Sequence, residues 1–337
     1  MTENVNSVTF KKEYMNFRTN ILLKPENNQL DYNSNLVLIG SCFSENISKK
    51  LHYFKFNTFS NPFGILFNPI AIETLITNAI YKKEYAEKDI FYLNERWHCF
   101  DAHSDLSAIS KNELLNNLNT SIKATNKKLT TASHILITLG TSWVYRNNET
   151  AKIVGNCHKI PQKQFSKALL SVDEIVASLT AICTLIKNIN PKVTIIFTVS
   201  PVRHLKDGFV ENMQSKAHLL TAIHQLIEIQ KQDFDSALLP ELSYFPSYEI
   251  MLDDLRDYRF YNGDMLHPNE TAINYIWDQF KQVWIDKKTF PILKEVDTIQ
   301  KGLAHKPFNP TSAQHQLFLK NLHQKIIELE NQLGIKF

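Results

Sequence analysis

Two short segments, far apart in the sequence, carry residue types that together perform nucleophilic catalysis. The first is Gly40-Ser41-Cys42, which follows a short apolar run and precedes a stretch of helical character. The second is Asp264-Met265-Leu266-His267, which stands directly before a proline. An aspartate three residues before a histidine in one loop can accept the Nδ1 hydrogen bond, which leaves Nε2 free to take a proton from a nucleophile. Together the segments predict a triad of Cys42, His267 and Asp264.

The thiol of Cys42 is expected at the start of a helix. Unpaired backbone N–H groups and the positive end of the helix dipole favour a thiolate there, so we expect a pKa below the ordinary value of about 8.5. Ser41 is a second candidate nucleophile, although its side chain should point elsewhere because it lies one residue earlier. Structural interpretations also remain open: Cys42 as a small buried side chain, and Asp264 as a turn cap.

The elements that must position these residues are alternating strands and helices. Apolar runs at 36–40, 134–139 and 193–199 are short and end in small or turn-forming residues, which is typical of strands buried on both faces of a parallel sheet. Apolar residues recur at helical spacing near 69–82, 111–129, 169–189 and 214–232. The alternation predicts an α/β sandwich, whose ligands bind beyond the carboxyl ends of the strands.

Three regions follow from the same pattern: a polar N-terminal arm at 1–34, the α/β domain at 35–290, and a C-terminal linker and amphipathic helix at 291–337. The last helix carries an apolar stripe with steps of three and four residues, formed by Leu319, Leu322, Ile326, Leu329 and Leu333. Two heptads are too short to require a coiled coil. We therefore favour packing on the same chain, with a homodimer through this helix as the alternative.

Composition excludes several classes of protein. The chain has 37 Lys and Arg against 34 Asp and Glu, a balance that argues against nucleic-acid or membrane partners. No apolar run reaches the roughly 18 residues of a membrane span and no leader pattern opens the chain, so we expect a cytoplasmic protein. The His98, Asp101 and His103 cluster lacks the paired spacing of a zinc site, so neither a metal nor a cofactor is expected.

Six segments of the chain occur in the order found in the GSCFA family. They are GSCFSEN, NPFGILFNP, ITLGTSWVY, GNCHKIP, TVSPVRH and YFPSYEIMLDDLRDYRFYNGDMLHP. The chain resembles this family from about residue 20 to residue 290. The family lies within the SGNH/GDSL hydrolase superfamily. The resemblance therefore implies a flavodoxin-like, three-layer α/β/α sandwich with a mostly parallel sheet, a C-terminal helical extension, and hydrolysis of acyl esters without a metal.

The resemblance also assigns roles by position. Superfamily members carry the nucleophilic serine in a Gly-Asp-Ser segment, and here Cys42 takes its place while Ser41 replaces the aspartate. Ser142 stands where the superfamily has an asparagine that donates to the oxyanion. Serine reaches less far than a carboxamide, so the amide of Asn156 is a second candidate for that role.

The remaining oxyanion donors are expected to be the backbone N–H groups of Cys42 and Gly64. Gly64 ends Asn61-Pro62-Phe63-Gly64, which resembles the second block of the superfamily and makes Asn61 a further candidate for binding the oxyanion or substrate. A glycine lets backbone approach a ligand closely. An ordinary turn after the proline is an equal alternative. His158 is a candidate pocket residue, or else a hydrogen-bonded structural histidine.

The sequence thus predicts an esterase, deacylase or acyltransferase that acts on an acyl ester or thioester through an acyl-thioester intermediate. The superfamily resemblance implies a small-molecule substrate or an acyl group on a glycan or lipid, and no residue pattern selects among them. The alternative is a non-catalytic member of the fold that binds a carbohydrate or a protein partner. It follows from the altered nucleophile and oxyanion positions.

Overall fold

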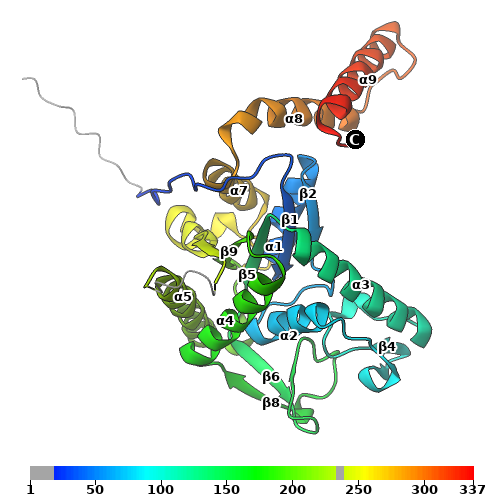
Figure 1. Cartoon of the computed structure of the whole chain (residues 1–337). Coiled ribbons are helices and arrows are strands. Elements are labelled where there is room, and N and C mark those ends of the chain that lie inside the picture. Colours follow the sequence, from blue (N-terminus) through cyan, green and yellow to red (C-terminus); the bar gives the residue numbers. More distant parts are fainter. Residues whose placement is uncertain (1–18, 233–238) are drawn as a thin grey trace, which may run out of the picture.

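A five-stranded parallel sheet forms the centre of the molecule (Figure 1). The computed structural model describes residues 19–232 and 239–337, so predictions about residues 1–18 lie outside the described residues. The strand order is β10-β9-β5-β1-β2, and every neighbouring pair is parallel. The strands are β1 (Asn35–Gly40), β2 (Asn57–Ser60), β5 (His134–Leu139), β9 (Thr194–Val199) and β10 (Glu241–Tyr244). The three predicted strands are therefore the three adjacent central ones.

Side chains of the central strands alternate between two hydrophobic cores, one on each face of the sheet. In β1, Val37 and Ile39 join one core, whereas Leu36 and Leu38 join the other. The first core packs against α2, α3, α4 and α5, and the second packs against α1 and α7. The helices are α1 (Cys42–Tyr53), α2 (Pro69–Ile80), α3 (Lys111–Thr131), α4 (Val172–Ile189), α5 (Phe209–Gln232), α6 (Ser247–Glu249), α7 (Glu270–Trp284), α8 (Phe290–Ala304) and α9 (Ala313–Leu333). The predicted α/β/α layering is confirmed.

Two small antiparallel sheets extend the domain beyond the predicted elements. One contains β6 (Trp143–Asn147), β7 (Ile153–Val154) and β8 (Phe165–Leu169), and the other pairs β3 (Phe91–Leu93) with β4 (Arg96–His98). The sequence analysis did not predict these short strands. The chain around β6 leaves the carboxyl end of β5, so this sheet lies beside the predicted site.

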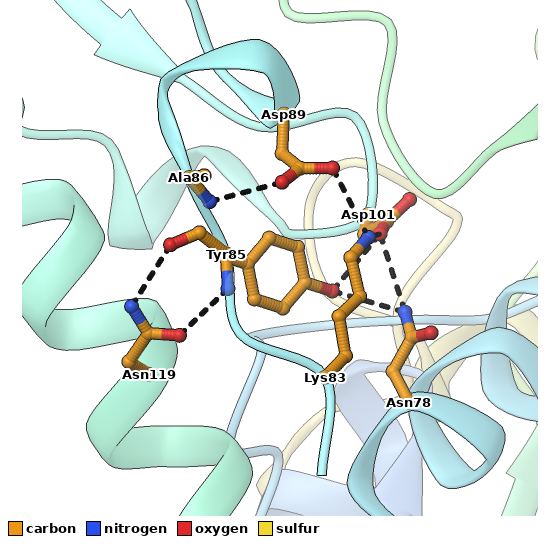
Figure 2. A network of polar contacts seen from close by, with 7 residues as sticks. All are labelled: Asn78, Lys83, Tyr85, Ala86, Asp89, Asp101 and Asn119. Carbon is orange, nitrogen blue, oxygen red and sulfur yellow. Dashed lines mark hydrogen bonds and ion pairs between the residues drawn. The ribbon is translucent and has the colours of Figure 1, made fainter. Parts of the chain in front are cut away.

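A polar network holds the connection between α2 and α3 (Figure 2). The Tyr85 hydroxyl donates to Asp101 at 2.9 Å, and Lys83 Nζ lies 3.1 Å from the same carboxylate. Both backbone groups of Tyr85 bond to the Asn119 side chain of α3, at 2.8 and 3.0 Å. Asp101, which belonged to the metal cluster considered from the sequence, is thus a structural ion-pair partner here.

The two ends of the described chain pack against the domain in different ways. Near the N-terminus, the backbone of Leu30 bonds to Trp284 and Asp286, just past α7. At the other end, α8 and α9 project away from the sheet (Figure 1). Leu322 and Leu329 of α9 are buried in a separate small core that they share with residues of α8. Most of the apolar stripe therefore packs within the chain, although Leu319 is exposed, and a homodimer through α9 stays a prediction. No helix among the described residues has both the length and the apolar character to cross a membrane.

Candidate active site

The turn from β1 into α1 positions Cys42, and it requires a glycine at residue 40. Gly40 has a φ of 144°, and a Cβ there would meet the Thr138 backbone of β5, with its C and N atoms at 2.8 Å. The Gly40 N–H donates to Asn61 Oδ1 at 2.9 Å, and the Ser41 N–H donates to Thr138 O at 3.0 Å. This turn is thereby tied to both neighbouring strands before the helix begins.

The side chains of Ser41 and Cys42 have different environments. Ser41 is 1% exposed, and its Oγ caps α1 by accepting the Phe43 N–H at 3.3 Å. Cys42 is the first residue of α1 and is partly exposed. Because the Ser41 hydroxyl serves the helix and is shielded from solvent, the arrangement supports Cys42 as the nucleophile candidate.

The pKa of the Cys42 thiol is raised, so the expected lowering is wrong. Burial is the largest cause, and the nearby Glu45 carboxylate adds to it. The backbone N–H groups at the start of α1 and the cation of Lys216 lower the pKa, but they do not outweigh burial. The helix dipole alone predicts a low pKa, but a thiol between a strand and a helix is also removed from water, and this desolvation raises its pKa.

The Asp264 and His267 side chains form the hydrogen bond that the sequence predicts. His267 Nδ1 lies 2.7 Å from Asp264 Oδ2, and each side chain is 45% exposed. Asp264 Oδ1 accepts the backbone N–H groups of His267 at 3.0 Å and Leu266 at 2.9 Å. These two backbone bonds, followed by the imidazole, lower the pKa of Asp264 to about 2. The carboxylate stays ionised and fixes the imidazole with Nε2 directed away from it.

The His267 loop lies at the edge of the sheet that also carries Cys42. The Arg203 N–H, four residues past β9, donates to Leu266 O at 3.1 Å. Because β1, β5 and β9 are adjacent and parallel, their carboxyl ends share this edge. The loop also falls within electrostatic range of His204, whose pKa is lowered to about 3 by burial, then Lys216, then His267.

Lys216 is a site residue that the sequence analysis missed. It lies on α5 and is 1% exposed, and its Nζ donates to Gly140 O and Ser200 O, both at 2.7 Å. These carbonyls directly follow β5 and β9. Burial lowers the pKa of Lys216 to about 7, and Cys42 is the charged group that raises it. The sequence could have indicated a buried lysine here, because Lys216 lies three residues before Leu219 and therefore on the apolar face of the helix.

Two of the expected oxyanion groups serve the fold. The Gly64 N–H donates to Asn61 O at 2.8 Å, which closes an ordinary turn. A Cβ on Gly64 would lie 2.5 Å from His103 Cβ, so the glycine makes room for a side chain of the domain. Asn61 supports the Gly40 turn through its own Oδ1. The structure thus favours the turn alternative for Gly64 and gives Asn61 a supporting position.

The other expected donor, Ser142, is fully buried. Its Oγ donates toward Ser215, 3.1 Å from both the carbonyl and hydroxyl oxygens, and its N–H donates to Ser215 Oγ at 2.7 Å. This side chain anchors the start of β6 to α5. The geometry therefore gives no support to Ser142 as an oxyanion donor.

His158 occupies a structural position. Its Nε2 lies 2.7 Å from Cys99 O and its Nδ1 lies 3.2 Å from Ser104 Oγ, so both ring nitrogens have partners. Burial lowers its pKa to about 4, which keeps the ring neutral near pH 7. Asn156 Oδ1 accepts the His158 N–H at 2.8 Å. The structural alternative for His158 is thus favoured, whereas the Asn156 amide nitrogen remains a candidate donor.

A cavity of about 320 Å³ adjoins the sheet edge on the side of β6. Its wall includes aromatic side chains and polar groups, among them Phe67, Trp143, Tyr145, Phe165, Asn156 and Lys206. Phe67 connects the cavity to the edge, because its carbonyl accepts the Gly140 N–H at 2.7 Å and its ring lies 5.8 Å from the His204 ring. A larger cavity of about 1000 Å³ between α1, α7 and α8 is lined by none of the predicted site residues, whereas the smaller one is lined by Asn156 and His158 but not by Cys42, Asp264 or His267.

The fold and this edge define a class of protein: an α/β sandwich with a thiol, an Asp–His pair and a buried lysine where its central strands end. The chain belongs to the GSCFA family, whose model matches residues 35–280. A second model, described as the C-terminal domain of GSCFA domain proteins, matches residues 296–336. In the described part of the chain, no group of three or more His, Cys, Asp or Glu is arranged to hold a metal ion.

Two solved structures resemble the chain weakly. One is a carbohydrate esterase family 3 protein from Talaromyces cellulolyticus, with 10% identity, a TM-score of 0.35, and coverage of 78% of this chain and 99% of the other. The second is an acetyl xylan esterase, Est2A, from the rumen bacterium Butyrivibrio proteoclasticus, with 11% identity, a TM-score of 0.38, and coverage of 82% of this chain and 66% of the other. A search of curated proteins gives no significant match.

Proposed function

We propose that this chain is a hydrolase of the SGNH/GDSL superfamily that cleaves an acyl ester or thioester. Cys42 is the nucleophile, His267 is the general base and acid, and Asp264 orients His267. One observation carries the proposal: the 2.7 Å Asp264–His267 pair sits on a loop bonded through Leu266 to the segment after β9, at the edge where Cys42 follows β1.

His267 takes up a proton and releases it again in each half of the reaction. Nε2 takes the proton of the Cys42 thiol, and the thiolate attacks the acyl carbonyl. The bond to the leaving alcohol breaks, the alcohol takes the proton from His267, and an acyl-thioester remains on Cys42. Water or an acceptor hydroxyl then loses its proton to His267 and attacks the thioester, and the C–S bond breaks to release the Cys42 sulfur, to which His267 returns the proton. Water gives hydrolysis, and an acceptor hydroxyl gives acyl transfer.

The oxyanion needs hydrogen-bond donors beside the sulfur. The Cys42 N–H is suited to this role, because the first N–H groups of a helix have no acceptor within the helix. The Asn156 side chain is the proposed second donor, since it lines the adjoining cavity. Gly64 and Ser142 are left out because their donor groups already bond within the fold.

The adjoining cavity suits an acyl group carried on a carbohydrate or lipid. Trp143 and Tyr145 supply flat apolar surface, and Lys206 supplies a charge. Aromatic walls with a few placed polar groups are typical of small-molecule sites, and such rings can stack on sugars. We therefore propose that the group bearing the ester binds here.

Incubation with a chromogenic short-chain ester, followed by intact mass measurement, tests the proposal. We expect turnover and an acyl adduct on the wild-type chain. Cys42→Ala should lose the adduct and reduce the rate on the order of 10³-fold or more. Cys157→Ala is the control for the site of the adduct, because Cys157 is the other partly exposed thiol, and the adduct should persist in this variant. Its turnover is not used as a control, since Cys157 lines the adjoining cavity. Equal turnover by wild type and Cys42→Ala would defeat the assignment.

A second candidate function is non-catalytic binding of a carbohydrate or protein partner. The raised pKa of Cys42 favours it, as do the engaged donor groups of Gly64 and Ser142. A pure binder does not need the oriented Asp264 and His267 pair, which is why we place catalysis first. Glycan binding that survives His267→Ala, in a chain without ester turnover, would support this second function.

A further inference from the structure

Lys216 is an unusual buried group. Moving an ammonium out of water is costly unless it is paired and hydrogen-bonded, yet this side chain is 1% exposed in the interior behind the sheet edge. Its two hydrogen-bond partners are the neutral carbonyls of Gly140 and Ser200. An ammonium has three N–H donors, so one donor is left beyond these two bonds.

The hydrogen bonds of Lys216 place its charge near the turn that carries Cys42. Gly140 follows β5, and β5 is the direct neighbour of β1, which ends at the Cys42 turn. Adjacent strands lie about 4.8 Å apart, so an Nζ bound to Gly140 O sits one strand away from that turn. The Ser41 N–H crosses the same gap to Thr138 O.

The role of Lys216 rests on the proposed function of Cys42 as the nucleophile. We propose that Lys216 is a positioning residue that stabilises the Cys42 thiolate through its buried positive charge. The negative sulfur and the ammonium then compensate each other at a site where either charge alone is unfavourable. His267 lies in the exposed loop and remains free to exchange protons with the substrate.

The groups around the pair agree with this role. The Tyr248 ring centroid lies 5.5 Å from Lys216 Nζ, so the aromatic face supplies further cation contact. His204, between β9 and α5, stays neutral near pH 7 because its pKa is lowered to about 3. Glu45 on α1 opposes the thiolate by raising the pKa of Cys42. Lys216 is therefore the side chain whose charge lowers the Cys42 pKa against burial and Glu45.

The test is the pH dependence of Cys42 alkylation by iodoacetamide, measured by intact mass in a Cys157→Ala background. We expect Lys216→Met to reduce the rate at pH 7 by about tenfold or more, with the rate at high pH preserved, because each unit of pKa changes the thiolate fraction tenfold. Lys83→Met is the control, since Lys83 pairs with Asp101 in the network of Figure 2. A folded Lys216→Met variant with the wild-type profile would overturn the proposal.

A second measurement covers a Lys216→Met variant that does not fold. Coupling between two titrating groups is reciprocal, so the thiolate must also raise the pKa of Lys216. The 13Cε signal of Lys216, followed by NMR against pH, should titrate at lower pH in Cys42→Ala than in wild type. An unchanged midpoint contradicts the proposed pair.

These readouts separate the present proposal from the proposed function, because alkylation and NMR titration need no ester turnover. A shifted alkylation profile in a chain that is inert toward esters supports the Lys216 pair and rejects the hydrolase. Cys42-dependent turnover with an unshifted Lys216→Met profile supports the hydrolase and rejects the pair.

Discussion

Replacing Gly40 by alanine tests whether the turn before Cys42 has the geometry described above. The added Cβ meets two obstacles in the folded chain. A φ of 144° is a conformation that side chains rarely adopt, and the methyl group would press on the Thr138 backbone in the central strand β5. The backbone of a fully buried strand cannot move aside as a flexible side chain can, so we expect the turn to shift.

The expected loss of stability follows from these two effects. Backbone strain of this kind costs about 1 to 3 kcal/mol, and overpacking adds about 1 to 3 kcal/mol. The alanine also reduces the entropy of the unfolded chain, which returns about 0.4 to 1 kcal/mol. We therefore expect the free energy of unfolding of Gly40→Ala to fall by about 1 to 6 kcal/mol. Equilibrium urea denaturation, monitored by fluorescence of the four tryptophans, measures this quantity.

Gly263→Ala is the matched control, because a Cβ at Gly263 meets no heavy atom within 4 Å and its φ is not in the restricted range. Its free energy of unfolding should stay within about 0.5 kcal/mol of wild type or rise slightly. The control is stringent, since Gly263 directly precedes Asp264. A Gly40→Ala chain as stable as the Gly263→Ala chain would show that the β1–α1 turn is not packed as described.

Three further perturbations probe other parts of the molecule. Asp264→Asn should reduce kcat toward the ester on the order of 10³-fold with little change in KM, because an amide cannot hold His267 in the same tautomer. Folding lowers the pKa of His158 from 6.5 to about 4, so the unfolded chain binds a proton at this ring more readily than the folded chain. This contribution to the stability of the fold is therefore fully present above pH 6.5, and the free energy of unfolding falls as the pH drops toward 4. The free energy of unfolding from urea denaturation should fall between pH 7 and pH 4.5 by up to about 3 kcal/mol more in wild type than in His158→Gln. Tyr85→Phe, which removes the hydroxyl bond to Asp101, should cost about 1 to 2 kcal/mol in the same assay.

Each of these expectations has a clear contrary result. Unchanged kcat in Asp264→Asn would remove this residue from the proposed mechanism. An identical pH dependence in wild type and His158→Gln would mean that folding does not shift the His158 pKa. A Tyr85→Phe chain with wild-type stability would show that the network in Figure 2 does not stabilise the fold.

Local signals were sufficient to predict the three central strands of the sheet and the Asp264–His267 pair, but not the edge strands β2 and β10. Apolar runs at β1, β5 and β9 identify buried strands because both of their faces meet helices, as the two cores confirm. The Asp264–His267 bond spans three residues in one loop, so the sequence contains both partners and their spacing. The short strands of the β6 sheet lack such a signal, since their pairing depends on residues up to 26 positions apart, from Trp143 to Leu169.

Ser142 and Gly64, two of the expected oxyanion donors, gain no support because each contacts a residue of the fold that is distant in the sequence. Ser142 bonds to Ser215, 73 residues away, and a Cβ on Gly64 would meet His103. Neither partner belongs to a segment that the GSCFA resemblance assigns to the site. Position in a motif therefore did not reveal that α5 engages the donor groups of Ser142, nor that the Gly64 N–H closes a turn with Asn61.

The pKa of Cys42 shows why a helix start alone does not predict a thiolate. Dipole and N–H groups act on any residue at this position, but burial between strand and helix acts against the charge and is the larger effect. A reactive thiol at such a place needs an additional cation to lower its pKa. Lys216 supplies one from α5, 174 positions after Cys42 in the chain, so no local pattern around Cys42 reveals it. Lys216 is a charged residue on the apolar, buried face of α5. A lysine at such a position must find oxygen acceptors inside the protein. The carbonyls that follow two strands supply those acceptors, so the sheet edge that presents the thiol also holds the charge that can activate it.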